Sequence, residues 1–303
     1  MTKTIAAVRS MRLRTLPLSL SGVLLGILLA VADYHVKPLT IVFIVLTTLS
    51  LQILSNLSNE LGDVLHGTDR DDRQGPQYGG LDKGVLTVSE MKMIIGAFIF
   101  LSVVFGLLMI WVSFGTFLSY EAMFLMILGA AAIIASMKYT LGKSPYGYRG
   151  LGDLFVFTFF GIVSVLGAYF VSAHTIHGFL LLLPAVSIGC FSVGVLNVNN
   201  IRDMKSDSVT RVTVAIKLGL KKARIYQTAL IVIGWAAAIT YCFLRVWDPW
   251  HYLFLLTLPL FVIHLRGVWT RQDKSLDPML PLLVMSSLAF SLLFGLGFLV
   301  YLM

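Results

Sequence analysis

Charged residues are scarce in this chain, and their scarcity excludes a soluble protein. Only 13% of the 303 residues are charged, whereas 57% are hydrophobic, and the mean hydropathy is +0.87. A soluble domain of this length carries about a quarter charged residues. The composition therefore indicates a membrane protein.

Cysteine and histidine are also rare. The two cysteines, Cys190 and Cys242, lie inside apolar segments, where we expect buried thiols that say nothing about the redox compartment. His174 and His177 fall in a loop on the outer side of the membrane, away from the acidic residues described below, so no zinc site is expected. No Ser, His and Asp share one face, and no catalytic triad is predicted.

Long apolar runs make up most of the chain. A helix needs about 17–25 residues to cross a bilayer. The segments that meet this length are 16–32, 40–62, 93–112, 121–137, 151–172, 178–200, 225–244, 252–268 and 280–301. The sequence therefore predicts an all-α membrane protein, a nine-transmembrane-helix bundle that forms a single domain over residues 1–303.

The basic residues lie on one side of this arrangement. If the segments alternate in direction, all of the 23 Lys and Arg except Lys37 and Arg245 fall on the side of the N-terminus. Cytoplasmic loops carry such an excess. We therefore expect a cytoplasmic N-terminus, and we assign the net charge of +8 to topology and to anionic phosphates, with no nucleic-acid partner.

The first segment has a competing interpretation. Residues 1–14 are basic, residues 16–29 are apolar, and Ala30-Val31-Ala32 is similar to a signal-peptidase site. The apolar run is long for a signal peptide. We therefore expect a first span that is retained.

Two acidic stretches, 58–69 and 199–207, each begin at the cytoplasmic end of an apolar segment. Both place acids and amides four residues apart, a spacing that stacks side chains on one face of a helix. Carboxylates at the membrane boundary are costly unless a cation offsets them, and Mg²⁺ commonly shares such carboxylates with substrate phosphates. The stretches predict two halves of one diphosphate-binding site. The spaced pairs are Asn59 and Asp63, Asn199 and Asp203, and Asp203 and Asp207.

Further polar residues on the cytoplasmic side have structural alternatives. Arg14 could face the anionic site or only anchor the first span, and Arg73 could pair with a phosphate or stay solvated. The loop 138–150 combines Gly, Tyr and cations, as an interfacial aromatic belt does. Glu60 is expected to flank the site. Asp153 lies just inside span five, and an acid within the membrane is a functional candidate by default.

The segment Thr210–Gly219 follows the second acidic stretch and is basic and amphipathic. It is too short and too charged to span a bilayer. It could form a cytoplasmic cap over a central cavity, or lie in the membrane interface with no role in chemistry.

With these residues assembled, the chain resembles the UbiA superfamily of intramembrane aromatic prenyltransferases over nearly its whole length. The six-residue separation of Asp63 and Asp69, with Gly67 between them, is similar to the branch that prenylates 1,4-dihydroxy-2-naphthoate in menaquinone synthesis. Arg211 keeps a positive charge where the superfamily usually has lysine, in a segment that otherwise departs from its pattern. The matching motifs are Asn59-x3-Asp63-x3-Gly67-x-Asp69, Arg73-x-Gly75-Pro76, Lys83-Gly84-Val85, Lys143-x-Pro145-Tyr146-x-Tyr148, Gly152-Asp153-Leu154-x-Val156-Phe157, Phe160-Gly161 and Asn199-Asn200-x-Arg202-Asp203-x3-Asp207.

The resemblance implies a Mg²⁺-dependent enzyme that transfers a polyprenyl group from an isoprenyl diphosphate to 1,4-dihydroxy-2-naphthoate, with decarboxylation, giving demethylmenaquinone. It also implies a bacterial cytoplasmic (inner) membrane location, in contact with the lipid bilayer, with a site open to the cytoplasm. The residues implied as metal ligands are Asp63, Asp69, Asp203 and Asp207, with Asn59 and Asn199. The residues implied to bind phosphate are Lys143, Arg73, Arg202 and Arg211, and those implied to bind the acceptor or line the cation pocket are Arg14, Tyr139, Tyr148 and Asp153.

Two other functions stay open from the sequence. One is a prenyltransferase of the same superfamily that uses 4-hydroxybenzoate or haem as acceptor. The other is a cation-coupled transporter, in which paired acids bind the cation. The acids here lie at helix ends on one side, which argues against a path through the membrane. Mg²⁺-dependent release of diphosphate would distinguish an enzyme from a transporter.

Overall fold

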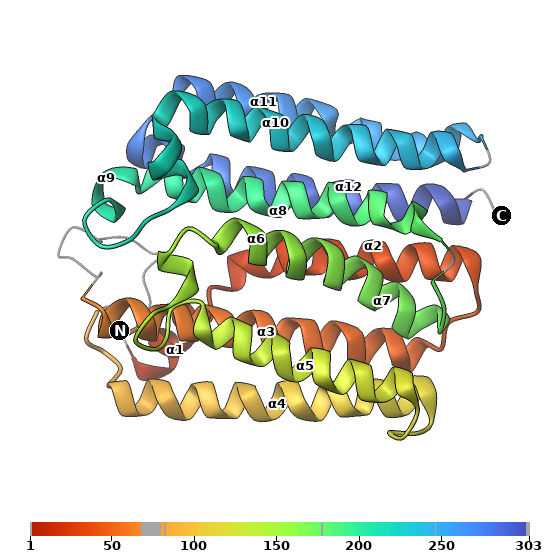
Figure 1. The fold of residues 1–303 in the computed structure, drawn as a ribbon, viewed down its shortest axis with the longest axis horizontal. Coiled ribbons are helices and arrows are strands. Elements are labelled where there is room, and N and C mark those ends of the chain that lie inside the picture. The colour runs from red at the N-terminus through yellow and green to blue at the C-terminus, as the bar shows by residue number, and fades with distance from the viewer. Residues whose placement is uncertain (1, 68–79, 82, 177, 246, 301–303) are drawn as a thin grey trace. The chain divides into compact units, whose positions relative to one another are not determined.

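The computed structural model describes residues 2–67, 80–81, 83–176, 178–245 and 247–300, and the elements in these ranges are helices (Figure 1). The α-helices are α1 (Lys3–Ser10), α2 (Leu16–Asp33), α3 (Pro38–Leu65), α4 (Val88–Phe114), α5 (Tyr120–Lys138), α6 (Gly152–Val156), α7 (Ser164–Ala173), α8 (Leu182–Arg202), α9 (Met204–Asp207), α10 (Val214–Leu244), α11 (Leu258–Thr270) and α12 (Met279–Val300). The 3₁₀ helices are Leu13–Thr15, Tyr146–Tyr148, Phe179–Leu181, Pro249–Thr257 and Asp273–Leu276, and Phe157–Val163 is a π-helix.

Nine helical stretches within the described ranges are long and apolar enough to cross a membrane. They coincide with the nine predicted segments, which confirms an all-α membrane protein. The sides that the termini face remain a prediction. The stretches are Lys3–Asp33, Pro38–Leu65, Val88–Phe114, Tyr120–Lys138, Gly152–Ala173, Phe179–Arg202, Val214–Leu244, Pro249–Thr270 and Asp273–Val300.

Some of these stretches are interrupted. The first changes direction at Arg12, which adopts a left-handed conformation with φ 48° between α1 and the next 3₁₀ turn. In α10, Gly219 has φ 72° and ψ 162°, values that only glycine adopts readily. The expected cap segment is therefore a short helical turn, capped by Thr213, that leads directly into span seven. Its place over a cavity remains a prediction.

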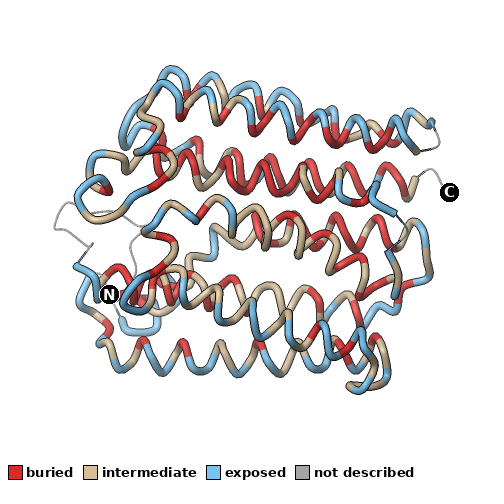
Figure 2. The backbone as a smooth tube through the Cα atoms, viewed as in Figure 1, coloured by how far each residue is buried: buried red, intermediate tan, exposed pale blue. Residues whose placement is uncertain are grey.

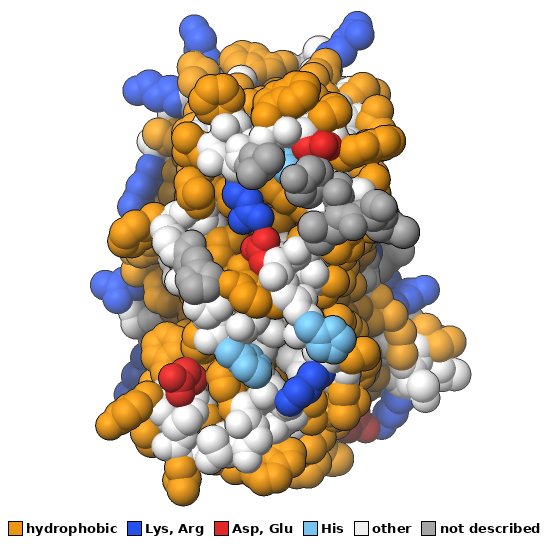
Figure 3. Space-filling view, turned by 90° about the vertical axis from the view of Figure 1, so that its right-hand side faces the viewer, with side chains coloured by type: hydrophobic (Ala, Val, Ile, Leu, Met, Phe, Trp, Pro, Cys, Tyr) orange, Lys and Arg blue, Asp and Glu red, His pale blue; other side chains and the backbone are white. Residues whose placement is uncertain are grey.

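The first of two compact units comprises Met1–Leu16 and Val42–Arg149. Its core joins Leu57 and Leu61 of α3 to Met91 of α4 and Ala6 of α1. Along α4 and α5 many apolar side chains remain exposed, as expected for helices in contact with lipid (Figure 2). Figure 3 faces the right-hand end of Figure 1, where hydrophobic side chains are interspersed with basic, acidic and histidine side chains.

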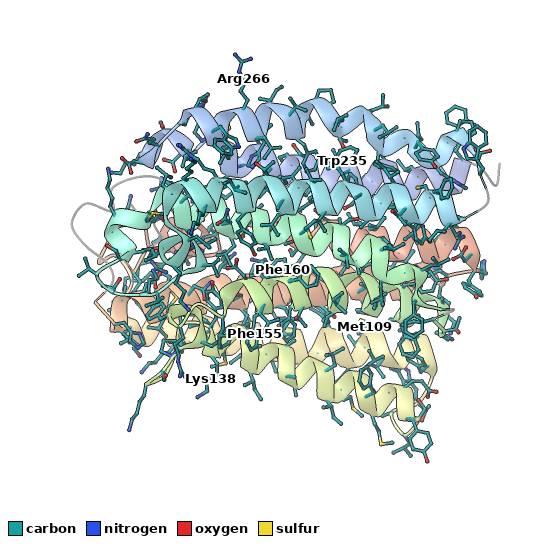
Figure 4. The ribbon with its side chains drawn as sticks, turned by 45° about the horizontal axis from the view of Figure 1, so that its top comes forward. Met109, Lys138, Phe155, Phe160, Trp235 and Arg266 are labelled. Carbon is teal, nitrogen blue, oxygen red and sulfur yellow. The ribbon has the colours of Figure 1, made fainter. Side chains whose placement is uncertain are left out.

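The second unit comprises Pro17–Ile41 and Gly150–Met303, and α8 is its most buried span. Aromatic side chains fill its core in edge-to-face pairs, the geometry that ring quadrupoles favour. Phe191 of α8 meets Phe290 of α12 at 5.0 Å and 89°, and Trp235 of α10, labelled in Figure 4, meets Phe261 of α11 at 5.4 Å and 89°. That residues 1–303 form a single domain remains a prediction.

Span five is built from α6, the π-helix Phe157–Val163 and α7, with Phe155 and Phe160 labelled in Figure 4. Glycine brings this span into backbone contact with α8. A Cβ on Gly161 would lie 2.6 Å from Gly189 Cα and 2.7 Å from the Ala185 carbonyl oxygen. Small residues allow such close approach of helices in membranes.

Candidate functional site

The first acidic stretch begins on an unbroken helix. Asn59 and Asp63 lie one turn apart in α3, as their spacing predicts. Asp63 is only 7% exposed, and its Oδ1 accepts a hydrogen bond of 2.5 Å from the Tyr148 hydroxyl. Asn59 Oδ1 accepts one of 3.3 Å from Thr140 Oγ1. The loop after α5 therefore orients both motif residues.

A glycine allows this loop to reach α3. A Cβ on Gly62 would lie 2.5 Å from the Thr140 Cβ and 2.7 Å from the Thr140 carbonyl oxygen. On the next turn, His66 lies between two carbonyl oxygens, with Nδ1 at 2.8 Å from that of Gly62 and Nε2 at 3.0 Å from that of Gly142. Its ring also meets Tyr148 edge to face at 5.4 Å and 77°. The loop is thus attached to α3 on both sides of Asp63.

The other predicted residues of this loop have different surroundings. Tyr139 packs edge to face on Tyr146 at 5.3 Å and 88°, and the Tyr146 hydroxyl donates to the Ala135 carbonyl oxygen at 2.7 Å. Burial, together with the neighbouring Tyr139, raises the pKa of Tyr146, so that hydroxyl stays protonated as a donor. Lys143 is exposed. Of the two tyrosines predicted here, Tyr148 reaches the acidic stretch and Tyr139 packs within the loop.

The N-terminal segment also lies against α3. Asn56 Nδ2, one turn before Asn59, donates to the Met11 carbonyl oxygen at 2.8 Å and to Thr15 Oγ1 at 2.9 Å. Arg14 lies in this segment with an exposed side chain. Asp69 and Arg73 fall outside the described residues.

Glu60, expected beside the site, is fully buried and joins other elements to α3. Its Oε1 accepts hydrogen bonds from Ser10 Oγ at 3.0 Å and from the Leu81 backbone nitrogen at 2.8 Å. It therefore holds α1 and the backbone at Leu81 against α3.

In the second unit, Arg202 binds the residues of the second acidic motif. Its Nε and Nη2 donate to Asp203 Oδ1 and Oδ2 at 2.8 and 2.6 Å, a two-point pairing that suits a guanidinium group. Nη2 also donates to Asn199 Oδ1 at 2.8 Å, and Nη1 to Asp277 Oδ1 at 2.9 Å. The arginine predicted to bind phosphate thus also orients Asn199 and Asp203.

Asp207 lies one turn further along. The backbone nitrogen of Asp207 donates to the Asp203 carbonyl oxygen at 2.8 Å, so the helical spacing continues from α8 into α9. Asp207 is 1% exposed, and its Oδ1 forms an ion pair of 2.9 Å with Arg211 Nη2. The positive charge of Arg211 therefore offsets the negative charge of the buried Asp207 carboxylate.

Asp153 has a partner that sequence reasoning missed. The Tyr226 hydroxyl, from α10, donates to Asp153 Oδ2 at 3.0 Å. Tyr226 stands in a long apolar helix with no motif around it, so no sequence signal connects it to Asp153. Thr140 was missed for the same reason, because its contact with Asn59 crosses 81 residues.

The two stretches offer oxygen ligands of the kind that Mg²⁺ prefers. In α3 these are one carboxylate and one amide. From the end of α8 through Asp203 to the end of α9 they are two carboxylates and one amide. Within the described part of the chain, no group of three or more His, Cys, Asp or Glu is arranged to hold a metal ion. The chemistry of the donors fits Mg²⁺, provided that substrate phosphates and water complete its coordination.

Comparison with known proteins agrees with the family resemblance seen in the sequence motifs. The model of the UbiA prenyltransferase family matches residues 19–288. The chain is 38% identical to the 1,4-dihydroxy-2-naphthoate octaprenyltransferase of Escherichia coli (strain K12) over 97% of its own length and 95% of the relative's. The fold is similar to that of a UbiA homologue from Aeropyrum pernix K1, with a TM-score of 0.69, 15% identity, and 97% and 98% of the two chains covered. A UbiA homologue from Archaeoglobus fulgidus bound to DMAPP and Mg²⁺ has a TM-score of 0.61 at 14% identity, covering 95% and 99%. The chain belongs to the UbiA prenyltransferase family.

Proposed function

We propose that this protein transfers a polyprenyl group from an isoprenyl diphosphate to 1,4-dihydroxy-2-naphthoate. The observation that carries the proposal is the 38% identity, over nearly the whole chain, with a relative named for this reaction. The oxygen-rich helix faces at Asn59 and Asp63, and at Asn199 and Asp203, support it chemically.

The diphosphate would be held by both acidic stretches through Mg²⁺. The proposed ligands are Asp63, Asp69, Asp203 and Asp207, with Asn59 and Asn199 beside them. The solved homologue from Archaeoglobus fulgidus, bound to DMAPP and Mg²⁺, supports this choice of metal. When bound, Mg²⁺ would neutralise the charge that develops on the diphosphate as it leaves.

The chain's own residues would prepare this site before substrate arrives. Tyr148 orients Asp63, and Arg202 orients Asp203 and Asn199, so the carboxylates need little reorganisation. Arg73, Lys143 and Arg211 would add positive charge for the phosphates. Arg14 and Tyr139 would lie at the edge of the site, and the apolar spans would keep water from the allylic cation.

The electron balance of the reaction defines its first product. The prenyl cation joins the ring, and the carboxylate leaves as CO₂ with its bonding electrons returned to the ring. No electrons are lost, so the immediate product is the hydroquinone form of demethylmenaquinone. Formation of the quinone itself would need a separate oxidant. We place the reaction at the cytoplasmic face of a bacterial inner membrane, because the basic residues gather on that side of the predicted topology.

The test is product identification with the purified chain in detergent, supplied with Mg²⁺, a polyprenyl diphosphate and 1,4-dihydroxy-2-naphthoate. We expect a prenylated, decarboxylated hydroquinone, no product with EDTA, and recovery on addition of Mg²⁺. Asp63→Ala and Asp203→Ala should each remain folded and lose turnover. Full activity in either variant would remove that aspartate from the proposed metal site.

A further inference from the structure

Arg202 is held by a carboxylate that belongs to neither acidic stretch. Its Nη1 donates to Asp277 Oδ1 at 2.9 Å, while its Nε and Nη2 pair with Asp203. Asp277 lies in the connection between α11 and α12, residues 271–278, at the end of the unit where α9 also lies (Figure 1). None of the motifs found in the sequence includes it. The arginine predicted to bind phosphate therefore has a second acidic partner, 75 residues further along the chain.

The connection that carries Asp277 is anchored to α8. Leu276, directly before Asp277, is fully buried. It packs in a cluster that includes Val198 and Ile201 of α8, and the same cluster includes Met279, two residues after Asp277. Burial of apolar side chains on both sides of Asp277 fixes the backbone that carries its carboxylate. Asp277 can therefore act as a rigid support for the end of α8.

This support restricts the Arg202 side chain. A guanidinium group has five N–H donors in a fixed planar arrangement. Nε and Nη2 donate to Asp203, Nη2 also donates to Asn199, and Nη1 donates to Asp277. With acceptors at all three nitrogens, the group cannot turn in its plane without losing a hydrogen bond. One N–H, on Nη1, has no acceptor among the described residues and is available to a phosphate oxygen.

Asp277 also changes the charge beside the second acidic motif. A cation is attracted by the sum of the charges near it. Arg202 with Asp203 alone would form a neutral pair, and the attraction for a divalent cation would be small. Asp277 adds a second carboxylate to the same guanidinium, at 2.9 Å, so the three groups together carry one negative charge. The negative charge near Asp203 is therefore kept although an arginine pairs with it.

We propose that Asp277 is a positioning residue for the diphosphate site, which holds Arg202 so that Asp203 and Asn199 keep the orientation of metal ligands. The inference rests on the proposed function and extends it to a residue outside both acidic stretches. Asp277 acts through Arg202 and does not itself contact Mg²⁺ or phosphate.

The test measures binding of a donor analogue and needs no turnover. Farnesyl thiolodiphosphate, whose C–S bond resists ionisation, is titrated calorimetrically onto the full chain in nanodiscs, with Mg²⁺ or with EDTA and without any naphthoate. Loss of a partner that orients a metal ligand commonly costs about 10–100-fold in affinity. Asp277→Ala should therefore weaken the Mg²⁺-dependent binding at least about tenfold. Asp277→Asn keeps an oxygen acceptor but loses the charge, and its affinity should lie between those of the wild type and Asp277→Ala.

Asp273→Asn is the matched control. Asp273, in the same connection, pairs with Lys205 at 2.8 Å, but the two side chains are 51% and 82% exposed, and a pair of this kind contributes little. Asparagine also tolerates the left-handed backbone of this position, with φ 48°. The variant removes the same charge from the same connection and should bind the analogue as the wild type does.

A double-mutant cycle tests whether Asp277 acts through Arg202. Lysine at position 202 keeps the charge but cannot bind two carboxylates in the guanidinium geometry. In an Arg202→Lys background, Asp277→Ala should therefore change the affinity by less than about twofold, the scatter expected of independent sites.

Wild-type affinity in Asp277→Ala, an equal loss in Asp273→Asn, or the full tenfold loss in the Arg202→Lys background would each overturn the inference. If Asp277→Ala fails to fold, the comparison of Asp277→Asn with Asp273→Asn decides it. A wild type that binds the analogue with Mg²⁺ but makes no product from 1,4-dihydroxy-2-naphthoate would overturn the proposed function and leave the role of Asp277 standing.

Discussion

Tyr146 and Tyr148 stand two residues apart in one short 3₁₀ helix, and their hydroxyls have different kinds of partner. Tyr146 donates to a backbone carbonyl oxygen, whereas Tyr148 donates to the carboxylate of Asp63. Partners of this kind orient a ligating carboxylate and adjust its affinity for metal. The Tyr146 hydroxyl therefore has a structural role, whereas the Tyr148 hydroxyl contacts the acidic motif.

Tyr148→Phe should weaken the use of Mg²⁺. Loss of such an outer partner commonly costs about 10–100-fold in metal affinity or activity. We expect the Mg²⁺ concentration for half-maximal rate to rise, the rate at saturating Mg²⁺ to fall, and the chain to stay folded. The measurement is the initial rate of prenyl transfer over a series of MgCl₂ concentrations.

Tyr146→Phe is the control, because it removes an equivalent hydroxyl from the same turn. It should leave the Mg²⁺ dependence unchanged and cost about 0.5–1.5 kcal/mol of stability. An equal shift in both variants would mean that Tyr148 acts only through the fold of the loop.

The sequence predicted the acidic residues as metal ligands, which stays a prediction, but it did not predict the side chains that pair with them. Asn59 and Asp63 are four residues apart on one helix, so periodicity alone brings them together. Tyr148 reaches Asp63 across 85 residues, and Tyr226 reaches Asp153 across 73. Such contacts depend on how the helices pack, and the spacing of neighbouring residues in one sequence does not report that packing. The composition of the 138–150 loop indicated that tyrosines mattered, without distinguishing Tyr148 from Tyr139.

At the scale of elements, span five is shaped by close packing. Its π-helix, Phe157–Val163, lies where Gly161 touches the backbone of α8. α2 also contacts this span through glycine, since a Cβ on Gly22 would lie 2.7 Å from the Phe160 carbonyl oxygen. π-helices occur frequently at functional sites, and this one begins four residues after Asp153. The π-helix directly follows α6, the short helix that carries Asp153.

Gly161→Ala should destabilise the protein. The new methyl group would meet Gly189 Cα at 2.6 Å and the Ala185 carbonyl oxygen at 2.7 Å, and backbone atoms cannot move aside as a flexible side chain can. Overpacking of this kind costs about 1–3 kcal/mol. The measurement is thermal unfolding of the purified chain in detergent.

Gly167→Ala, in the same span, has no neighbour within 4 Å of the added Cβ and should be neutral or slightly stabilising. If Gly161→Ala unfolds at the same temperature as Gly167→Ala, the close contact between span five and α8 does not contribute to stability.

Hydrophobic length predicted the spans, but not the irregular turns inside them. The π-helix and the 3₁₀ helix Pro249–Thr257 are as apolar as the regular helices that follow them. The break at Gly219 lies inside one continuous helical element. Their cause is tertiary packing and backbone conformation at single glycines, which hydropathy does not report. The first span likewise includes Arg12 in a left-handed conformation that composition gives no reason to expect.

At the scale of the whole molecule, the distribution of charge predicts which side of the membrane the acidic stretches face. Only Lys37 and Arg245 of the 23 basic residues fall on the predicted outer side. Burial and the carboxylate of Asp33 act in opposite directions on Arg245, and the pairing with Asp33 prevails and raises its pKa. Arg245 therefore stays charged but paired, and the asymmetry that directs insertion comes from the opposite side.

Single cysteines can test this topology, because the native ones are hidden. Cys190 and Cys242 are buried, with 4% and 0% exposed, so an impermeant maleimide should not react with them. Lys37 and Lys143 are both exposed and lie on opposite predicted sides. We expect Lys143→Cys to be labelled in inside-out membrane vesicles and Lys37→Cys in right-side-out vesicles.

The reverse pattern would place both acidic stretches outside the cell, where the proposed reaction could not draw on cytoplasmic substrates. The wild-type chain serves as the control for labelling of the buried thiols. Labelling of Lys143→Cys from the inner side alone would place the loop that holds Tyr148, and with it Asp63, at the cytoplasmic face, because that loop is bonded directly to α3.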